Sequence, residues 1–286
     1  MAGKKISLVL GSGGARGYAH IGVIEALEAR GYEIVSVSGC SMGALVGGLY
    51  ACGKLAEYKK WVLELDPLDV AGLLDLAWDR RGLMNGSKVF ERMEELVGSR
   101  KIESLPIRFT AVSADLNRGK EVWFQDGDLL TAIRASIAIP SVFTPVELDG
   151  MLLVDGGVLN PLPIAPTMSD RSDMTIAVNL YGPDEDAKAS GEKKRYDSFV
   201  ERLASKAKRA VRERLQQQEQ LHAISILNQS FDTMQRSLTQ YRIGGYPPDV
   251  MIELPKNICS SFDFHKAGVL IPAGRAAAER VLDQLS

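Results

Sequence analysis

The chain of 286 residues has few of the features that would tie it to a metal, a disulfide framework or nucleic acid. Its three cysteines form no C-x-x-C pair, which fits a reducing compartment and argues against a disulfide scaffold or a zinc cluster. Its three histidines do not stand at metal-ligand spacing. The 34 basic and 36 acidic side chains leave a net charge of −2, so no overall field attracts nucleic acid. We therefore expect no metal and no nucleic-acid partner.

Long hydrophobic runs are also absent. The longest strongly apolar stretch without a charge, residues 43–53, contains four glycines and is far shorter than the ~20 apolar residues that cross a bilayer. Near the N-terminus, the apolar run at residues 6–10 is followed by glycines and Arg16, which does not suit a signal peptide. We therefore expect no transmembrane helix and a cytoplasmic location.

What the sequence does contain is the composition of an ordinary globular protein, with 45% hydrophobic and 24% charged residues. Residues 6–10 have the pattern of a buried strand, followed by a glycine-rich turn and a helical pattern that ends at Gly31. Residues 32–37 repeat the strand pattern, and a second helical pattern ends near Gly53. Two successive βα units predict an α/β fold with a mixed, mainly parallel sheet and helices on both faces.

The rest of the chain extends this sheet. Residues 55–98 have helical spacing and predict a helical insertion. We expect further strands at 106–115, 120–124, 146–148, 151–154, 174–180 and 250–254, and helices at 129–138 and 275–285. This predicts one domain over residues 1–286, with a core at 6–180, a helical lid or docking segment at about 192–245, and a closing strand and helix at 249–285.

The strongest chemical signal is the G-x-S-x-G segment at residues 39–43, between an expected strand and an expected helix. A strand that turns at once into a helix strains its middle residue, and Gly39 and Gly43 remove the side chains that would collide there. The Ser41 hydroxyl is then presented at the carboxyl edge of the sheet, beside helix amides that attract negative charge. We interpret Ser41 as a nucleophile, the alternative being a tight turn without chemistry.

The second signal is the glycine-rich segment GSGGARG at residues 11–17. As a G-x-G-x-x-G dinucleotide fingerprint counted from Gly11, it has Arg16 where the third glycine belongs, and the acidic residue expected at the end of the next strand is missing. What remains is a run of backbone amides at a helix start, suited to an oxyanion. A nucleotide-dependent oxidoreductase stays open as an alternative.

The third signal is Asp155, followed by Gly156 and Gly157, where a buried strand is expected to end. Such a triplet is usually only a turn. A serine nucleophile needs a base, however, and Asp155 offers a carboxylate from a strand end of the same sheet. The three signals together therefore indicate acyl-transfer chemistry.

These motifs, in this order, resemble the patatin-like phospholipase family. The stretch LGSGGARGYAHIGVIEAL at residues 10–27 is similar to the small bacterial RssA-type members and to the catalytic domain of neuropathy target esterase. The segments ASIAIP at 135–140 and DGGVLNP at 155–161 match the family as well. The resemblance covers roughly residues 6–180.

The resemblance implies a Ser-Asp dyad, with Ser41 as nucleophile and Asp155 as base. It implies an oxyanion hole of backbone amides, which we expect from Gly13, Gly14, Ala15 and Met42. Supporting motif positions are Gly11, Ser12, Arg16, Gly17, Gly39, Gly43, Gly156 and Gly157. Ser12 stands where the family has a glycine, and a positive φ there would cost of order 1 kcal/mol.

For function, the resemblance implies hydrolysis of lipid acyl esters without a cofactor, as a phospholipase A, a lysophospholipase or a carboxylesterase. One alternative is a Ser-His-Asp triad with His222 or His265 as base. Another is a catalytically silent regulatory protein with the same fold.

Residues 192–214 carry nine basic and four acidic side chains, a local charge of +5. Apolar side chains recur along one side of this helical pattern. A surface helix docked on the core is the simplest interpretation. A lid, a dimer contact or a peripheral helix on an anionic membrane surface is the functional alternative.

Overall fold

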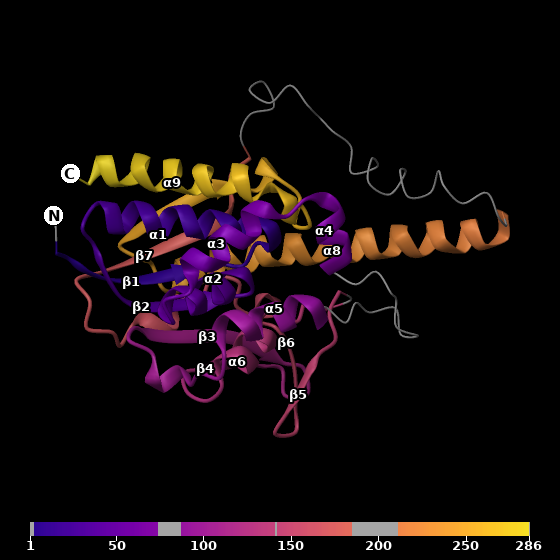
Figure 1. Cartoon of the computed structure of the whole chain (residues 1–286), viewed down its shortest axis with the longest axis horizontal. Helices are drawn as coiled ribbons and strands as arrows, with labels where there is room; N and C mark the ends of the chain where they lie inside the picture. The colour runs from indigo at the N-terminus through magenta and orange to yellow at the C-terminus, as the bar shows by residue number, and fades with distance from the viewer. Residues whose placement is uncertain (1–2, 74–86, 141, 185–210, 286) are drawn as a thin grey trace.

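The structure, a computed structural model, describes residues 3–73, 87–140, 142–184 and 211–285 (Figure 1). Its centre is an eight-stranded sheet in the order β5-β6-β3-β2-β1-β7-β8, with β4 also paired to β3. The strands are β1 (Lys5–Leu10), β2 (Glu33–Cys40), β3 (Arg108–Asp115), β4 (Lys120–Phe124), β5 (Val146–Leu148), β6 (Met151–Asp155), β7 (Met174–Gly182) and β8 (Val250–Pro255). Along the sheet, the neighbouring strands β3, β2, β1, β7 and β8 pair in parallel. Both β4 and β6 pair antiparallel with β3. The predicted mixed, mainly parallel sheet is confirmed.

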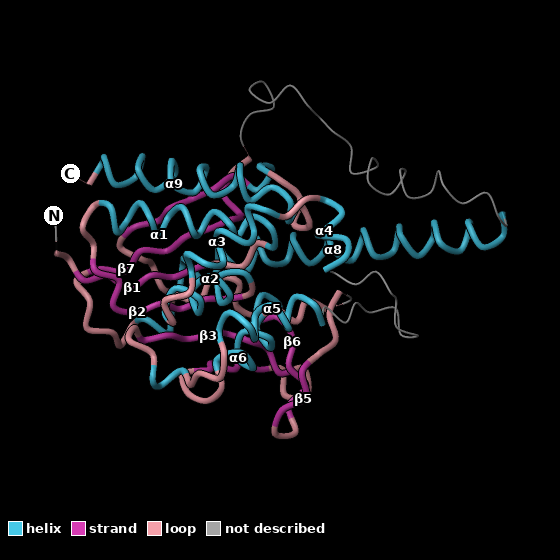
Figure 2. The backbone as a smooth tube through the Cα atoms, viewed as in Figure 1, coloured by secondary structure: helices cyan, strands magenta, loops and turns pink. Residues whose placement is uncertain are grey.

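Helices cover this sheet on both faces (Figure 2). They are α1 (Ala19–Ala29), α2 (Met42–Ala51), α3 (Leu55–Glu64), α4 (Pro67–Leu73), α5 (Ser87–Val97), α6 (Leu129–Ser136), α8 (Val211–Gly245) and α9 (Ala267–Gln284). Strand residues alternate between two cores: Leu8 and Leu10 join the large core with α1, α2, α6 and α9, whereas Val9 faces the other way. On that second face, Ile243 of α8 packs against a smaller cluster.

Two glycines let the backbones of α1 and α9 come into contact. The two helices lie side by side in Figure 1. A Cβ at Gly22 would lie 1.9 Å from the carbonyl oxygen of Ile271, and a Cβ at Gly274 would lie 2.0 Å from that of Ala19. Any side chain at either position would force the helices apart. The C-terminal helix is thereby fixed to the first βα unit, and β8 extends the same sheet.

The structure corrects several predicted boundaries. The last helix begins at Ala267, eight residues before the predicted start at 275, and Pro272 lies inside it. Proline usually ends a helix because it lacks an N–H, which is why the sequence pattern placed the start too late. Residues 14–18 form a 3₁₀ turn, η1 (Gly14–Tyr18), before the first α-helix begins.

The basic segment falls mostly outside the described residues, which resume at 211. From there, α8 runs as one helix of 35 residues, and its N-terminal half extends beyond the rest of the described body (Figure 1). Within the described residues, no helix has the length and apolar character needed to cross a membrane.

Candidate active site

Ser41 occupies a sharp elbow between β2 and α2. Its backbone angles, φ 55° and ψ −126°, lie in a region that non-glycine residues rarely adopt. A Cβ at Gly39 would lie 2.4 Å from the carbonyl oxygen of Gly43, and a Cβ at Gly43 would lie 2.0 Å from that of Leu10. The two glycines of the motif are therefore required for the turn to close. The strain at Ser41 is of order 1–3 kcal/mol and is held by its surroundings.

Buried serines hold the elbow from behind. The Ser41 amide donates to the Ser136 hydroxyl at 3.0 Å, and that hydroxyl donates to the Val112 carbonyl of β3 at 2.6 Å. The Ser113 hydroxyl likewise donates to the Val154 carbonyl of β6 at 2.6 Å. These bonds tie the ends of β2, β3 and β6 together, so the elbow is fixed to the strand that carries Asp155.

Ser41 and Asp155 meet because two strands of opposite direction share one edge of β3. β2 pairs in parallel with residues 108–112, and β6 pairs antiparallel with residues 113–115. β4 pairs with residues 111–115, which overlaps both, so it must occupy the other edge. The carboxyl ends of β2 and β6 therefore face each other at the middle of that edge, with Ser41 following one and Asp155 ending the other.

Asp155 is fully buried, with one carboxylate oxygen engaged and one not. Its Oδ1 accepts from the Gly157 amide at 2.7 Å and lies 3.8 Å from the Cys40 thiol. Its Oδ2 has no hydrogen-bond partner among the described residues. Burial raises the pKa of Asp155 to about 6, although the nearby Ser41 hydroxyl and the Gly157 amide both lower it. The carboxylate is thus more basic than an ordinary aspartate.

Hydrogen bonds in the glycine-rich loop decide which of its amides are free. The Gly11 amide donates to the Val178 carbonyl at 3.1 Å, and the Ser12 amide donates to the Pro161 carbonyl at 2.8 Å. The Ala15 amide donates to the Ser261 carbonyl at 2.8 Å. The expected contribution of Ala15 to the oxyanion hole is therefore wrong in this structure, because its N–H is already engaged. In the described structure the Gly13 and Gly14 amides make no hydrogen bond outside η1. The Met42 amide is at the first position of α2, where an amide has no acceptor in the helix.

Loop conformation shows why the glycines are needed. Gly14 has φ 56°, and a Cβ there would lie 2.4 Å from the Ser261 carbonyl oxygen. Ser12 does not adopt positive φ, so the serine at this position introduces no strain. A Cβ at Gly17 would lie 2.3 Å from the Cβ of Met42, which brings η1 against α2. The loop is therefore shaped by backbone contacts.

Arg16 is buried beneath this loop, its side chain only 2% exposed. Its Nε donates to the Gly13 carbonyl at 3.0 Å, and its Nη1 donates to the Lys256 carbonyl at 3.0 Å. Its Nη2 donates to the Ser261 hydroxyl at 2.9 Å and lies 3.5 Å from an Asp232 carboxylate oxygen. All three guanidinium nitrogens thus hold protein groups, which is a structural role.

The glycines after Asp155 also permit close contacts. A Cβ at Gly156 would lie 2.2 Å from the Val112 carbonyl oxygen, so this glycine lets the loop turn beside β3. A Cβ at Gly157 would lie 2.1 Å from the side-chain amide nitrogen of Gln235 on α8. Asp155 is therefore packed between the sheet and α8, which is distant along the chain.

No described histidine is placed to act as the base. The His20 ring is fully buried, and its Nε2 is 2.8 Å from the Gly11 carbonyl oxygen. Burial lowers the pKa of His20 to about 4, so the ring is neutral and supports the loop. His265 is exposed and does not line the cavities beside Ser41. The side chain of His222 lies outside the described residues.

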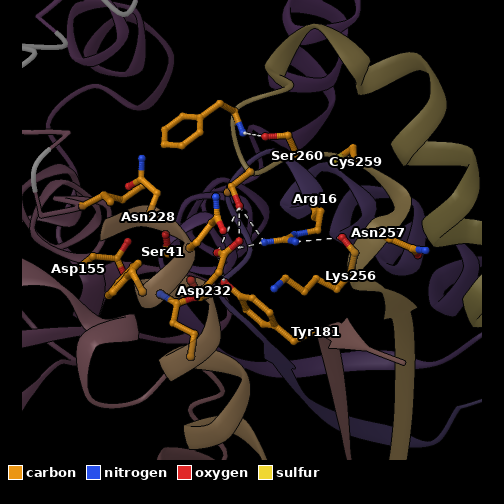
Figure 3. Close-up of a pocket in the computed structure, with 18 of the residues that line it drawn as sticks. Arg16, Ser41, Asp155, Tyr181, Asn228, Asp232, Lys256, Asn257, Cys259 and Ser260 are labelled. Carbon is orange, nitrogen blue, oxygen red and sulfur yellow. Dashed lines mark hydrogen bonds and ion pairs between the residues drawn. The ribbon is translucent and has the colours of Figure 1, made fainter. Parts of the chain in front are cut away.

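Ser41 borders two cavities of different character. The larger, about 400 Å³, is lined mostly by polar side chains, including Arg16, Asp155 and Asp232 (Figure 3). The smaller, about 80 Å³, is lined almost entirely by apolar side chains from α2 to α5 and their surroundings, such as Leu45 and Trp61. A molecule bound at Ser41 therefore meets a polar space on one side and an apolar space on the other.

Sequence reasoning missed the wall of the larger cavity opposite the motifs. It is formed by α8 and residues 256–262, and includes Asp232, Gln235 and Ser261. Isolated acidic and amide residues in a polar helical pattern give no signal, because such patterns usually belong to solvated faces. The hydrogen-bond partners of their side chains lie at least 29 residues away along the chain, so only the fold brings them together.

Comparisons with known proteins agree with these motifs. Residues 8–168 match the family model described as patatin-like phospholipase. An uncharacterized NTE family protein of Mycobacterium tuberculosis is 37% identical over 329 residues, covering 98% of this chain and 91% of that protein. The chain is also 32% identical over 192 residues to the patatin-like phospholipase domain-containing protein 6 of Mus musculus, covering 65% of this chain and 14% of that protein.

Among solved structures, VipD from Legionella pneumophila has a TM-score of 0.48 and 16% sequence identity, covering 98% of this chain and 67% of that one. The family assignment depends instead on the family model, which spans more than half of the chain, and on the relative aligned along almost its whole length. The chain belongs to the patatin-like phospholipase family.

Proposed function

We propose that this protein is a serine hydrolase of lipid acyl esters that works through a Ser41–Asp155 dyad. Lipid ester hydrolysis is what the family implies. The observation that carries the finer proposal is the strained Ser41 elbow beside a buried carboxylate that has an oxygen without a partner among the described residues. A nucleophile next to a base of raised pKa is the arrangement that acyl transfer needs.

The chemistry follows from the positions of these groups. The Ser41 Oγ attacks the ester carbonyl carbon while its proton passes to Asp155 Oδ2. The negative charge on the tetrahedral intermediate is stabilised by the Gly13 and Gly14 amides, with the Met42 amide at the helix start. Collapse of the intermediate breaks the ester bond, and the alcohol leaves with the proton from Asp155. Water then attacks the acyl-enzyme with Asp155 again as base, releasing the fatty acid and restoring Ser41.

The two cavities support an orientation for the substrate. The apolar cavity suits the acyl chain, because transfer of each methylene from water to an apolar site contributes about 0.8 kcal/mol. The polar cavity suits the alcohol part of the ester, which carries hydroxyl or charged groups. Leu45, on α2 one helical turn after Ser41, lines the apolar cavity. Leu45→Trp should therefore raise KM for long acyl chains more than for acetyl esters of the same alcohol.

The decisive experiment combines labelling with turnover. A fluorophosphonate probe should label Ser41 alone, detected as a single modified peptide by mass spectrometry. A panel of lipid esters, read by mass spectrometry of the released acids, should then identify the substrate class. Absence of both labelling and hydrolysis in folded protein would favour a silent regulatory member of the fold.

Contact with an anionic membrane surface remains a separate proposal. It depends on the +5 charge of residues 192–214, which lie mostly outside the described residues. Basic residues near an anionic surface each contribute about 1 kcal/mol, and salt weakens this. Co-sedimentation with anionic liposomes should therefore decrease with salt and on changing Arg209 and Arg212 to Glu, and binding unaffected by either would exclude the proposal.

A further inference from the structure

The face that α8 turns toward the active site is polar. Asp232, Gln235, Thr239 and Arg242 follow one another at spacings of three, four and three residues, which places them along one side of the helix. Gln235 and Thr239 are 1% exposed, and Arg242 donates to the Leu159 carbonyl at 2.9 Å and pairs with Glu121. A helix that only covers a core presents an apolar stripe. This face instead holds groups that bind the loops of the candidate active site.

Asp232 reaches the oxyanion loop through Arg16. Among the described side chains, Asp232 is the one carboxylate that Arg16 contacts, at 3.5 Å, and the Ser261 hydroxyl bridges the pair. Arg16 in turn donates to the Gly13 carbonyl. In a planar trans peptide the carbonyl and the next N–H point in opposite directions, so this bond directs the Gly14 N–H away from the guanidinium. The orientation of a proposed oxyanion donor is thus set by an ion pair with α8.

Gln235, one turn later on α8, reaches the base. Its side-chain amide lies against the backbone of Gly157, where a Cβ would be 2.1 Å from its nitrogen, and its carbonyl oxygen accepts from the Tyr181 hydroxyl. The Gly157 amide is the group that donates to Asp155 Oδ1. The side chain of Gln235 therefore holds the loop that orients the carboxylate and shields it from solvent. Figure 3 shows Asp232 and Arg16 turned toward each other at this cavity, with Asp155 and Tyr181 also lining it.

We propose that α8 is part of the catalytic apparatus: Asp232 positions the oxyanion loop through Arg16, and Gln235 positions the Asp155 loop through Gly157. Both are positioning residues, since neither needs to touch the reacting atoms. The inference rests on the proposed hydrolase function, because it assigns these residues to that reaction. It requires kcat to depend on α8 side chains that come from outside the family motifs.

In the full chain, Asp232→Asn tests the positioning of the oxyanion loop, and Gln235→Ala tests the positioning of the Asp155 loop. Each variant should lower kcat by about 10- to 100-fold with little change in KM for a short, soluble ester, since a displacement near 1 Å is enough for such a loss. Asp232→Glu, which restores the charge, should recover part of the rate. Rates are expressed per site titrated with fluorophosphonate, so unfolded protein does not count.

The pH dependence of kcat/KM gives a second measurement for Gln235, and a loss of folded protein would not change its midpoint. Removing its side chain admits water beside Asp155, so the midpoint of the kcat/KM profile should fall below that of the wild type. Within the described residues, the other titratable groups that interact with Asp155 are the Cys40 thiol of β2 and the Tyr181 phenol of β7. Burial raises the pKa of each, so neither titrates in this range.

Matched controls come from the exposed side of the same helix. Arg236→Gln removes a charge next to Gln235, and Gln240→Ala repeats the same truncation at an exposed position. Both should keep the wild-type kcat. If Asp232→Asn and Gln235→Ala stay within twofold of these controls, the inference is wrong. If the wild type is labelled at Ser41 but hydrolyses no ester, the function proposal fails, and the labelling rates of the same variants still decide the positioning roles.

Discussion

The two walls of the candidate site are held by different means. The wall that carries Ser41 and Asp155 is shaped by backbone contacts at the ends of β1, β2, β3 and β6, with glycines at the closest approaches and the buried Ser113 and Ser136 hydroxyls behind them. The opposite wall, from α8 and residues 256–262, is fixed mainly by side chains, with the Arg16–Asp232 pair at its centre, and one backbone bond joins Ala15 to Ser261. Backbone contacts allow almost no alternative residue, whereas side-chain contacts allow many.

This difference explains what each wall leaves in the sequence. Gly39, Gly43 and Gly156 cannot be replaced without strain, because a Cβ at each position would lie 2.0 to 2.4 Å from a carbonyl oxygen. Such positions form short, recognisable motifs. Asp232 and Gln235 bind their partners through side chains, and a different pair of residues on a different turn could do the same. The comparison leads to predictions about how severely each wall responds to change.

The largest effect should come from Ser41→Ala. Loss of the only proposed nucleophile should reduce ester turnover by at least about 10³-fold and abolish fluorophosphonate labelling, with the fold retained. Steady-state hydrolysis and intact-protein mass spectrometry measure the two effects. Ser104→Ala, in a distant 3₁₀ turn, is the matched control and should behave as wild type. Turnover undiminished in pure Ser41→Ala protein would remove the nucleophile assignment.

Asp155→Asn should follow, lowering kcat by about 10²- to 10⁴-fold, because an amide cannot accept the serine proton. Asp149, in the exposed turn between β5 and β6, gives a control of the same chemistry, since Asn also tolerates its φ of 48°. Asp149→Asn should leave kcat unchanged. Equal rates for the two variants would mean that another group accepts the proton.

The raised pKa of Asp155 makes two pH-dependent effects measurable. The proposed dyad needs the ionised carboxylate, so kcat/KM should rise with pH through about 6. The free energy of unfolding changes in the opposite direction, because the pKa of Asp155 in the folded protein exceeds its ordinary value of 3.8. The protonated group contributes its full stabilisation below pH 3.8, and this contribution is lost as pH rises through about 6.

Asp155→Asn removes this titration. Relative to the wild type, the variant should therefore gain of order 2–3 kcal/mol of unfolding free energy between pH 4 and pH 8, the equivalent of the pKa difference. Denaturant unfolding at the two pH values measures the gain. A stability difference independent of pH would show that the buried carboxylate is not perturbed in this direction.

Much of the sheet, and the wall that carries Ser41 and Asp155, could be predicted from the sequence because both depend on local patterns. Buried strands such as residues 6–10 leave continuous apolar runs in the sequence, and sharp turns between a strand and a helix leave glycines. The meeting of Ser41 with Asp155 was only partly foreseeable, since it depends on β6 running antiparallel along the edge that β2 also uses. No local pattern records which edge of a neighbouring strand is taken.

Two errors have physical causes of the same kind. The family resemblance predicts the Ala15 amide in the oxyanion hole, but this amide donates to the carbonyl of Ser261, a residue 246 positions later whose approach no motif reveals. The sequence pattern predicts the start of the C-terminal helix too late because Pro272 lies within the helix. Local propensity cannot report tertiary contacts that override it.

A smaller, structural effect separates glycines that are required from those that are not. Gly43→Ala should lower the free energy of unfolding by about 2 kcal/mol or more, because the new Cβ meets the Leu10 carbonyl oxygen and neither backbone can move freely. Gly244→Ala, near the end of α8 with nothing within 4 Å of its Cβ, should be neutral or stabilising by up to about 1 kcal/mol. Thermal and urea unfolding distinguish the two, and similar values would contradict the backbone account of this wall.

The smallest effect is expected from His265, and it separates the dyad from a triad. His265 is exposed and lines neither cavity, so His265→Ala should keep kcat within about twofold of the wild type. His222→Ala extends the test to a histidine whose side chain lies outside the described residues, and the dyad predicts the same small change. Each variant is compared by kcat per fluorophosphonate-titrated site, so a loss of folded protein is not mistaken for a loss of chemistry. A fall in kcat comparable with that of Ser41→Ala in either folded variant would make that histidine the base and leave Asp155 to orient its imidazole.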